Sequence, residues 1–257
     1  MKNDDWFLKW FFLIIIFAAV LSFVMVSNVK SSSWDDYIKE EVVGDKTVWY
    51  DNSILIQSPY RALDPAGVEI SIYDRAPSVA DYTKLTLVIE ENPTPCCAIF
   101  EFYNMPAYVE TNIRVNAYGY LRVIAEDNYG NKFMTTQFIK AAGGCSAPSV
   151  LKTDKAKGSI EVKEPLIKPG ITRFQIWHPN YSGMQFDQLT RAEIPAEYID
   201  EVDIYFDDSS FHYEGTIGIA ENVYFGLASN KDGNVIASDN LDNNFLYFNE
   251  IEREIYE

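Results

Sequence analysis

Hydrophobic and polar residues alternate with a period of two along most of the chain beyond residue 47. Apolar residues occupy every second position at Val68, Ile70 and Ile72. The same period returns in the runs 85–89, 98–102, 113–115 and 121–123. Alternation of this kind places the apolar side chains on one face of a β-strand. Because turn residues, such as those at 127–131, separate the runs, we predict an antiparallel β-sandwich.

A second strand-rich segment follows a stretch with the composition of a linker. Residues 146–163 include a proline, a glycine and four lysines, which favour an irregular connection. Further strand runs follow at 172–177, 202–206 and 211–214, with a hairpin turn predicted at 230–233. The pattern therefore predicts an all-β protein with two β-sandwich domains and a hinge between them.

The amino terminus carries an uninterrupted apolar run. Residues 10–26 are 17 positions without a charge, a length between that of a secretory core and that of a typical membrane-spanning helix. Lys2 and Lys9 supply a positive flank. We predict an N-terminal hydrophobic helix within residues 1–30 that acts as a signal peptide or, if uncleaved, as an inner-membrane anchor. Either outcome places the rest of the chain outside the cytoplasm, in an oxidising compartment.

The charge of the chain narrows the choice of partners. It has 21 basic and 38 acidic residues, and residues 170–257 alone hold 4 basic and 17 acidic ones. Nucleic acid and anionic membrane surfaces are excluded as partners because both need clustered Lys and Arg. The acidic second segment predicts either docking to a cationic protein or a solvated surface that keeps the protein soluble. With 2 His and 3 Cys, we expect no metal site of the usual zinc type and no cofactor.

Cys145 is the first candidate for chemistry. It follows Gly143 and Gly144, which permit an unusual backbone conformation and place no bulk beside the thiol. Lysines at 140, 152, 155 and 157 lie near it in sequence, and cations lower the pKa of a thiol. The residues leave three interpretations open: a reactive thiol, a loop cysteine without a role, or half of a disulfide.

The remaining cysteines and the histidines give weaker signals. Cys96 and Cys97 are adjacent at a strand entry, which fits either small core residues or a strained disulfide. His178 precedes a proline, and His212 alternates with aromatic residues on a predicted strand. Neither histidine shows metal-ligand spacing. A thiol hydrolase would need a histidine close to Cys145 in space, and no protease signature accompanies this cysteine.

Several short motifs follow one another along the two segments. The motifs of the first segment are 54–59 (Ile-Leu-Ile-Gln-Ser-Pro), 68–70 (Val-Glu-Ile), 91–95 (Glu-Asn-Pro-Thr-Pro), 112–115 (Asn-Ile-Arg-Val) and 143–145 (Gly-Gly-Cys). The motifs of the second segment are 178–179 (His-Pro), Gly183 and 194–199 (Ile-Pro-Ala-Glu-Tyr-Ile). On these residues the chain resembles the SoxY and SoxZ carrier proteins fused in one chain. More closely, it resembles the fused carriers associated with quinoprotein dehydrogenases.

The resemblance implies a fold and a role. It implies two immunoglobulin-like β-sandwich domains in tandem, SoxY-like at 31–145 and SoxZ-like at 164–257, with 146–163 as the linker. It implies a periplasmic protein, either soluble or anchored to the inner membrane, on which Cys145 holds a sulfur intermediate covalently. Gly143 and Gly144 support that motif, and His178 has a structural or docking role. Unlike in the separate carrier, the cysteine here is followed by a whole domain and not by a free carboxy-terminal arm.

Three hypotheses on function follow. The first is a non-catalytic carrier that presents its cargo to periplasmic redox enzymes, which are a quinoprotein dehydrogenase, a c-type cytochrome or sulfur-oxidation enzymes. The second is a two-domain module that docks a quinoprotein dehydrogenase or cytochrome without covalent cargo. The third is an enzyme, either a thiol hydrolase or an oxidoreductase. Selective reaction at Cys145 separates the second from the other two, and turnover without partners supports only the third.

Overall fold

The computed structural model describes residues 33–75, 82–148, 154–164 and 168–249. The chain divides into two compact units, residues 1–37 and 38–257, and the described strands all lie in the second unit. The apolar helix predicted at residues 10–26 lies outside the described residues. Within the described ranges, no helix is long and apolar enough to cross a membrane.

Among the described residues, nearly all the regular elements are strands. The elements, in chain order, are η1 (Trp34–Ile38), α2 (Lys39–Val43), β1 (Val48–Tyr50), β2 (Ile54–Gln57), β3 (Val68–Asp74), β4 (Tyr82–Ile89), β5 (Cys96–Tyr103), β6 (Tyr108–Ile113), β7 (Gly119–Asp127), β8 (Lys132–Ile139), β9 (Ile160–Lys163), β10 (Thr172–Ile176), β11 (Ile199–Tyr205), β12 (Ser210–Gly215), β13 (Tyr224–Leu227), β14 (Asn234–Asp239) and β15 (Asn244–Tyr247). The all-β prediction is confirmed, and the immunoglobulin-like assignment stays a prediction.

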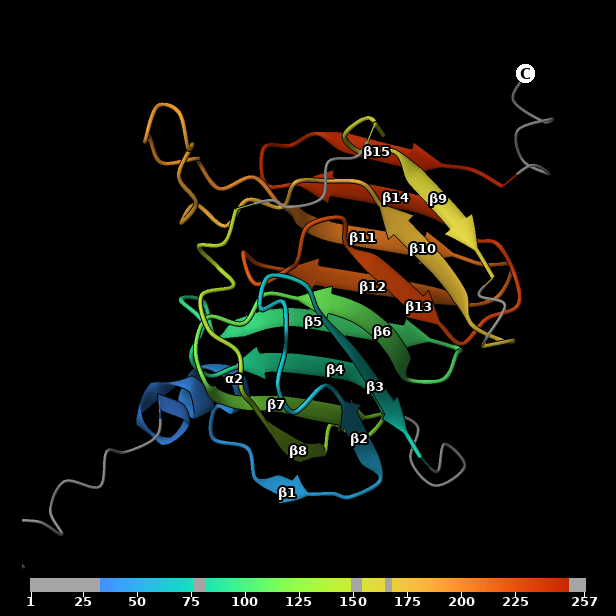
Figure 1. Ribbon diagram of the computed structural model, residues 1–257. Coiled ribbons are helices and arrows are strands. Elements are labelled where there is room, and N and C mark those ends of the chain that lie inside the picture. The colour runs from blue at the N-terminus through green and yellow to red at the C-terminus, as the bar shows by residue number, and fades with distance from the viewer. Residues whose placement is uncertain (1–32, 76–81, 149–153, 165–167, 250–257) are drawn as a thin grey trace, which may run out of the picture. The chain divides into compact units, whose positions relative to one another are not determined.

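The strands form two sheets (Figure 1). We call the part of the chain that carries β1–β8 and Cys145 the first half, and the part that carries β9–β15 the second half. Both sheets contain strands from the two halves. The nine-stranded sheet has the order β1-β8-β7-β4-β5-β12-β11-β14-β15, and the six-stranded sheet has the order β2-β3-β6-β13-β10-β9. The halves meet where β5 pairs with β12 and where β6 pairs with β13, both antiparallel. Backbone hydrogen bonds therefore cross from one half to the other in both layers.

This pairing corrects the expectation of a hinge. The β5–β12 ladder alone joins six residue pairs, from Ala98 opposite Gly215 to Tyr103 opposite Ser210. The last residues of the predicted linker form β9 at the edge of the six-stranded sheet. Among the described residues, the two halves thus form one continuous sandwich. Periodicity identifies strands but not their partners, so it does not reveal that two strands pair across a domain boundary. The exact domain boundaries stay predictions.

The inner faces of the sheets share one hydrophobic core. Val68, Ile70 and Ile72 are all buried, as the period of two predicts. Aromatic rings cross the junction of the halves: Phe100 of β5 lies 6.2 Å from Phe211 of β12 between ring centroids. Phe211 in turn lies 5.5 Å from Phe225 of β13 in the other sheet. Because these large side chains are buried together, the halves stabilise one another through apolar packing as well as hydrogen bonds.

One predicted turn is confirmed and one is wrong. Residues 127–131 join β7 and β8, which pair as antiparallel neighbours. The hairpin predicted at 230–233 is wrong, because β13 lies in the six-stranded sheet and β14 in the nine-stranded sheet. The turn therefore carries the chain from one layer to the other, and β14 pairs with β11 instead.

Candidate functional site

The Gly-Gly-Cys segment follows β8, and its two glycines serve different needs. Gly143 has a φ of +82°, in the region that side chains rarely adopt. Gly144 donates its N–H to the carbonyl oxygen of Val115 at 3.0 Å. A Cβ atom on Gly144 would lie 2.0 Å from the carbonyl oxygen of Pro65, so only glycine fits there. The first glycine supplies the turn, and the second allows close backbone packing.

The Cys145 side chain is fully buried, with an exposed fraction of 0%. The expectation that nothing shields this thiol is therefore wrong for this conformation. Burial raises the pKa of Cys145 to about 11, and the charge of Arg114 acts in the opposite direction. At that pKa about one thiol in ten thousand is ionised at pH 7. In this conformation both the burial and the raised pKa protect the thiol from reaction.

The lysines near Cys145 in sequence have other partners. Lys155 forms an ion pair with Glu161, and Lys157 pairs with two carboxylates. The Lys140 ammonium lies 4.9 Å from the centroid of the Tyr60 ring. Lys152 lies outside the described residues. The cation that acts on the pKa of the Cys145 thiol is therefore Arg114 and not one of these lysines.

Arg114 links the cysteine segment to both halves of the chain. Its Nη1 donates to the Gly144 carbonyl oxygen at 3.0 Å, and its Nη2 donates to the Asn180 carbonyl oxygen at 3.2 Å. The side chain is buried, and burial lowers the pKa of its guanidinium. The buried Nε atom of Arg114 has no hydrogen-bond partner in the described part of the chain. One donor of a buried cation thus remains available beside the cysteine segment.

Asn92 fixes the backbone that carries Arg114. Its Nδ2 donates to the Arg114 carbonyl oxygen at 2.8 Å, and its Oδ1 accepts from the Asn116 N–H at 2.8 Å. The asparagine is buried, so both bonds form away from water and hold the chain rigidly. The resemblance motif at 91–95 therefore contributes to the site by positioning Arg114.

A loop from the second half covers the cysteine segment. The Ser182 hydroxyl donates to the carbonyl oxygen of Cys145 and lies 3.0 Å from Gln185 Oε1. Asn180 has a φ of 45° and presents its carbonyl oxygen to Arg114. Three buried residues that sequence reasoning did not select thus close the site: Arg114, Asn180 and Ser182.

His178 anchors that loop. It is buried, with its Nδ1 atom 2.7 Å from Asn180 Oδ1 and its Nε2 atom 3.4 Å from Asp239 Oδ2. Burial lowers the pKa of His178, although its hydrogen bonds to Asp239 and Asn180 act to raise it. This environment fits the structural role expected for His178. A line of polar contacts runs from Asp239 through His178 and Asn180 to Arg114.

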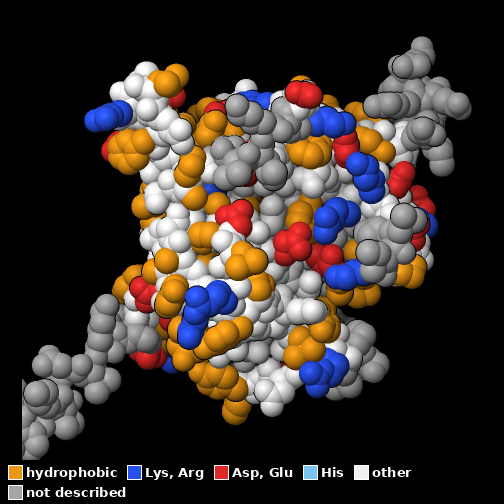
Figure 2. Space-filling model, viewed as in Figure 1, with side chains coloured by type: hydrophobic (Ala, Val, Ile, Leu, Met, Phe, Trp, Pro, Cys, Tyr) orange, Lys and Arg blue, Asp and Glu red, His pale blue; other side chains and the backbone are white. Residues whose placement is uncertain are grey.

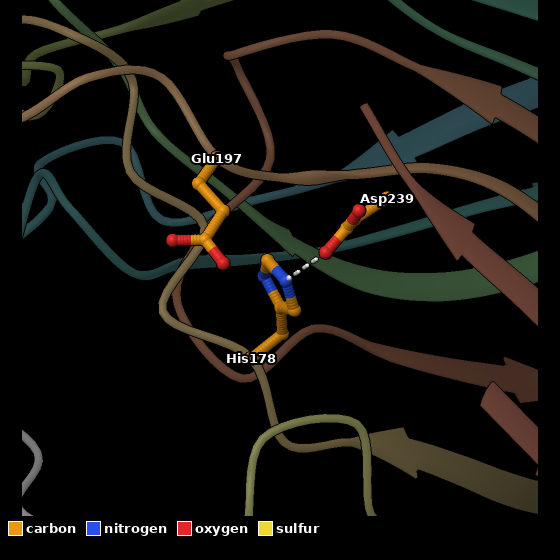
Figure 3. Close-up of side chains that lie close together, drawn as sticks. All are labelled: His178, Glu197 and Asp239. Atoms are coloured by element: carbon orange, nitrogen blue, oxygen red, sulfur yellow. Dashed lines mark hydrogen bonds and ion pairs between the residues drawn. The ribbon is translucent and has the colours of Figure 1, made fainter. Parts of the chain in front are cut away.

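His178, Glu197 and Asp239 lie close enough together to suggest a metal site (Figure 3). However, the Lys157 ammonium pairs with both carboxylates and lies 3.2 Å from Asp239. Burial alone would raise the pKa of Asp239, but hydrogen bonds from Asn243, the Leu241 N–H and Lys157 lower it to about 2. The lysine supplies the positive charge that these carboxylates require, so the cluster is an ion-pair network.

The three cysteines are all free thiols. Cys97 is buried in the core, and Cys96 is half-buried. This arrangement favours the interpretation of Cys97 as a small core residue over a strained disulfide with Cys96. Cys145 is likewise not half of a disulfide.

Comparison with known proteins identifies both halves. The family model "Sulfur oxidation protein SoxY" matches residues 39–145, and "Sulphur oxidation protein SoxZ" matches residues 169–247. The two matches follow one another and together take in most of the chain. The matches thus define a two-part protein of the sulfur-oxidation class. The chain belongs to the family of fused SoxY/SoxZ-like proteins, as its motifs predict.

A solved structure shares a limited similarity with the first half. The sulfur carrier protein SoxY from Chlorobium limicola f thiosulfatophilum is 20% identical, and the match covers 42% of this chain and 92% of that one, with a TM-score of 0.37. A similarity of this extent carries no argument on function. A search of curated proteins found no match. The family therefore rests on the two domain matches, of which the first ends at Cys145.

Proposed function

We propose that this protein is a non-catalytic carrier that holds a sulfur-containing group covalently on Cys145 and presents it to redox enzymes. The main support is that the SoxY match ends at this residue, where a buried arginine meets the Gly-Gly-Cys backbone. A guanidinium with a free Nε donor suits a cargo that carries negative charge. In this proposal Cys145 binds the cargo, and Gly143 and Gly144 shape the backbone of the cysteine segment. Arg114 positions that segment through the Gly144 carbonyl oxygen.

The linkage forms by exchange at sulfur. The Cys145 thiol loses its proton to solvent, and the thiolate attacks a terminal sulfur of a polysulfide. A bond forms between Cys145 Sγ and that sulfur, one S–S bond of the donor breaks, and the shortened polysulfide leaves with the electron pair. Cys145 then carries a persulfide anion, and no other oxidant is consumed. In the reverse step, a thiolate attacks the outer sulfur, the new S–S bond breaks, the outer sulfur passes to the attacking group, and Cys145 leaves as a thiolate.

The buried thiol gives the carrier a closed state. The contacts of Arg114 and Ser182 to the cysteine segment must break before Cys145 meets a donor. Exposure to water removes the burial that raises its pKa, so opening also increases the thiolate fraction. The closed state thereby limits oxidation of a thiol in an oxidising compartment.

A second function competes with this proposal. In it the chain is a module that docks a periplasmic quinoprotein dehydrogenase or cytochrome, and Cys145 carries nothing. The burial and raised pKa of Cys145 favour this alternative.

Polysulfide loading distinguishes the two functions. The purified protein is treated with inorganic polysulfide, and the added sulfur is located by peptide mass mapping. The carrier proposal expects the mass of the Cys145 peptide to rise in steps of about 32 Da, one sulfur atom per step, and a thiol reductant to remove the added mass. Cys145→Ser should abolish it, and Cys96→Ser, which removes the half-buried cysteine, should not. Addition at Cys96 alone would contradict the carrier and support the docking module.

The place of action follows from the amino-terminal sequence. We propose that residues 10–26 direct the chain to the periplasm, where it is either released or held at the inner membrane. The apolar run and its lysine flank support this. Fractionation of the tagged protein should recover it outside the cytosol. A variant that lacks residues 1–30 should instead remain in the cytosol. Recovery of the full-length protein mainly from the cytosol would contradict export.

A further inference from the structure

The outer face of the nine-stranded sheet differs between the two halves of the chain. In the first half, two apolar side chains in the middle of this face are covered: Val88 has an exposed fraction of 0% and Ile124 of 3%, whereas Tyr103 at the end of β5 is exposed. Val42 of helix α2 lines a small cavity together with Ile124 and Ile99, so the helix lies over this part of the sheet. Helix α2 therefore shields the middle of the outer face in the first half.

In the second half the equivalent apolar side chains are open to solvent. Ile236 of β14 and Leu246 of β15 are directly opposite one another, with exposed fractions of 40% and 57%. Tyr205 of β11 and Phe248 beyond β15 are also exposed. We call these four residues the outer patch. The inward side chains next to them, Val235 and Ile204 among them, are buried, so the outer patch is not needed to complete the core.

Acidic residues adjoin the outer patch on the same face. Asp203 is directly opposite Ile236 in the β11–β14 pair. Glu201 and Glu214 are directly opposite one another in the β11–β12 pair, and both are exposed. Like charges in this position destabilise a sheet. His212 contacts Asp203 and Glu214, but even a protonated histidine balances one of the three carboxylates and leaves the other two uncompensated. We call these three acids the acidic rim.

From the outer patch and the acidic rim we infer a docking surface for a cationic protein whose contact face has apolar residues beside Lys or Arg. Apolar side chains bury area against the partner, and basic side chains relieve the repulsion between Glu201 and Glu214. The inference goes beyond the proposed function because it does not depend on any cargo at Cys145.

Charge argues against two other occupants. A second copy of the chain brings a net charge of −17 and an identical acidic rim. The chain's own residues 250–257 contain four glutamates and one arginine, so they too are repelled. Opposite charge selects a basic partner over both.

The other face of the molecule supplies a control. Over the six-stranded sheet, acidic and basic side chains lie among one another (Figure 2). A groove of about 990 Å³ there is lined by both signs, and its Lys168 pairs with Glu110. Glu69 and Glu164 line the same groove and are exposed. Removing their two charges changes the net charge as much as removing Glu201 and Glu214.

The test measures binding of a basic probe protein, mitochondrial cytochrome c, by titration calorimetry. We expect binding to the full chain at about 20 mM ionic strength and a Kd raised about tenfold or more at about 200 mM. Glu201→Gln/Glu214→Gln should raise the low-salt Kd about five- to tenfold, and Ile236→Ser/Leu246→Ser by a similar factor. Glu69→Gln/Glu164→Gln and Cys145→Ser should leave it within about twofold.

Four other outcomes would each overturn the inference. Failure of the probe to bind at low ionic strength would show that the surface does not select a cation. Equal loss in both glutamate double variants would show attraction by net charge alone. Self-association of the unmodified chain that Ile236→Ser/Leu246→Ser abolishes would make a second copy the occupant. Binding that requires deletion of residues 250–257 would make the chain's own terminus the occupant. Loss of Cys145 loading with probe binding intact would affect only the proposed function.

Discussion

The half of the chain that matches SoxY and the half that matches SoxZ contribute differently to the Cys145 site. The first half builds the cysteine segment, because Gly144 fits against Pro65 and Arg114 holds its carbonyl oxygen. The second half closes it through the Asn180 carbonyl and the Ser182 hydroxyl. The comparison shows that the glycines of the first half shape the segment, whereas residues of the second half cover it.

The largest expected effect concerns the core that the halves share. Phe211→Ala removes a buried ring that contacts Phe100 and Phe225 and should lower the free energy of unfolding by about 3–5 kcal/mol. Phe100→Ala, on the other side of the junction, should cost a similar amount. Urea unfolding followed by circular dichroism and by tryptophan fluorescence should give one coincident transition in each protein. Two separate transitions, with each variant shifting only one, would restore two independent domains.

The two glycines of the cysteine segment should respond unequally to alanine. Gly144→Ala places a Cβ 2.0 Å from the Pro65 carbonyl oxygen and should destabilise the fold by about 3 kcal/mol or more. Gly143→Ala meets nothing within 4 Å but keeps a φ of +82°, which should cost about 1 kcal/mol. Urea denaturation of both variants measures the difference. Equal effects would mean that backbone packing at Gly144 is looser than the structure shows.

The serine of the covering loop should control access to the thiol. Ser182→Ala removes the hydrogen bond to the Cys145 carbonyl, worth about 1 kcal/mol, and should speed alkylation of Cys145 about fivefold. Mass mapping of iodoacetamide-treated protein gives the rate, with Cys96 as the internal reference. Ser159→Ala, which removes a hydroxyl bonded to Ala156 away from the site, is the matched control. An unchanged rate in Ser182→Ala would show that the loop does not limit access.

The smallest effect separates the two histidines of the second half by the sign of their pH dependence. Burial lowers the pKa of His178 below its ordinary 6.5, so its contribution to stability is present above pH 6.5 and lost as the pH falls through the lowered value. Burial would also lower the pKa of His212, but Asp203 and Glu214 raise it above 6.5. The contribution of His212 is therefore present below pH 6.5 and lost as the pH rises through the raised value.

The variant His212→Gln separates the contributions of the two histidines to the free energy of unfolding. The free energy of unfolding of the unmodified protein should fall on both sides of a maximum near neutral pH. In His212→Gln the decline above pH 6.5 should disappear, whereas the decline below pH 6.5, which His178 causes, should persist. Identical pH profiles for the two proteins would contradict the assignment to His212.

The sequence predicts the strands of this protein better than their partners. Residues such as Val68, Ile70 and Ile72 face the core because their period fixes which side of a strand they occupy. The pairing of β5 with β12 was not predictable, since register and partner depend on contacts far apart in the chain. The turn at 230–233 failed for the same reason, because its residues favour a reversal but do not choose the sheet.

The sequence likewise predicts some features of the Cys145 site and not others. The Gly-Gly-Cys motif located the candidate thiol, and the positive φ of Gly143 agrees with the need for glycine. The burial of Cys145 and the roles of Asn180 and Ser182 were not predictable, because they arise where segments separated by more than thirty residues meet. Arg114 offered one signal: it is a charged residue at the end of an alternating apolar run, where burial requires partners.

Intact-mass spectrometry of the protein purified without reductant tests the carrier role most directly. The account predicts added mass that a reductant removes, that maps to Cys145, and that is absent from a folded Cys145→Ser variant. A Cys145 that is adduct-free and inert to alkylation in the native protein, or that is joined stably to Cys96 or Cys97, would contradict it.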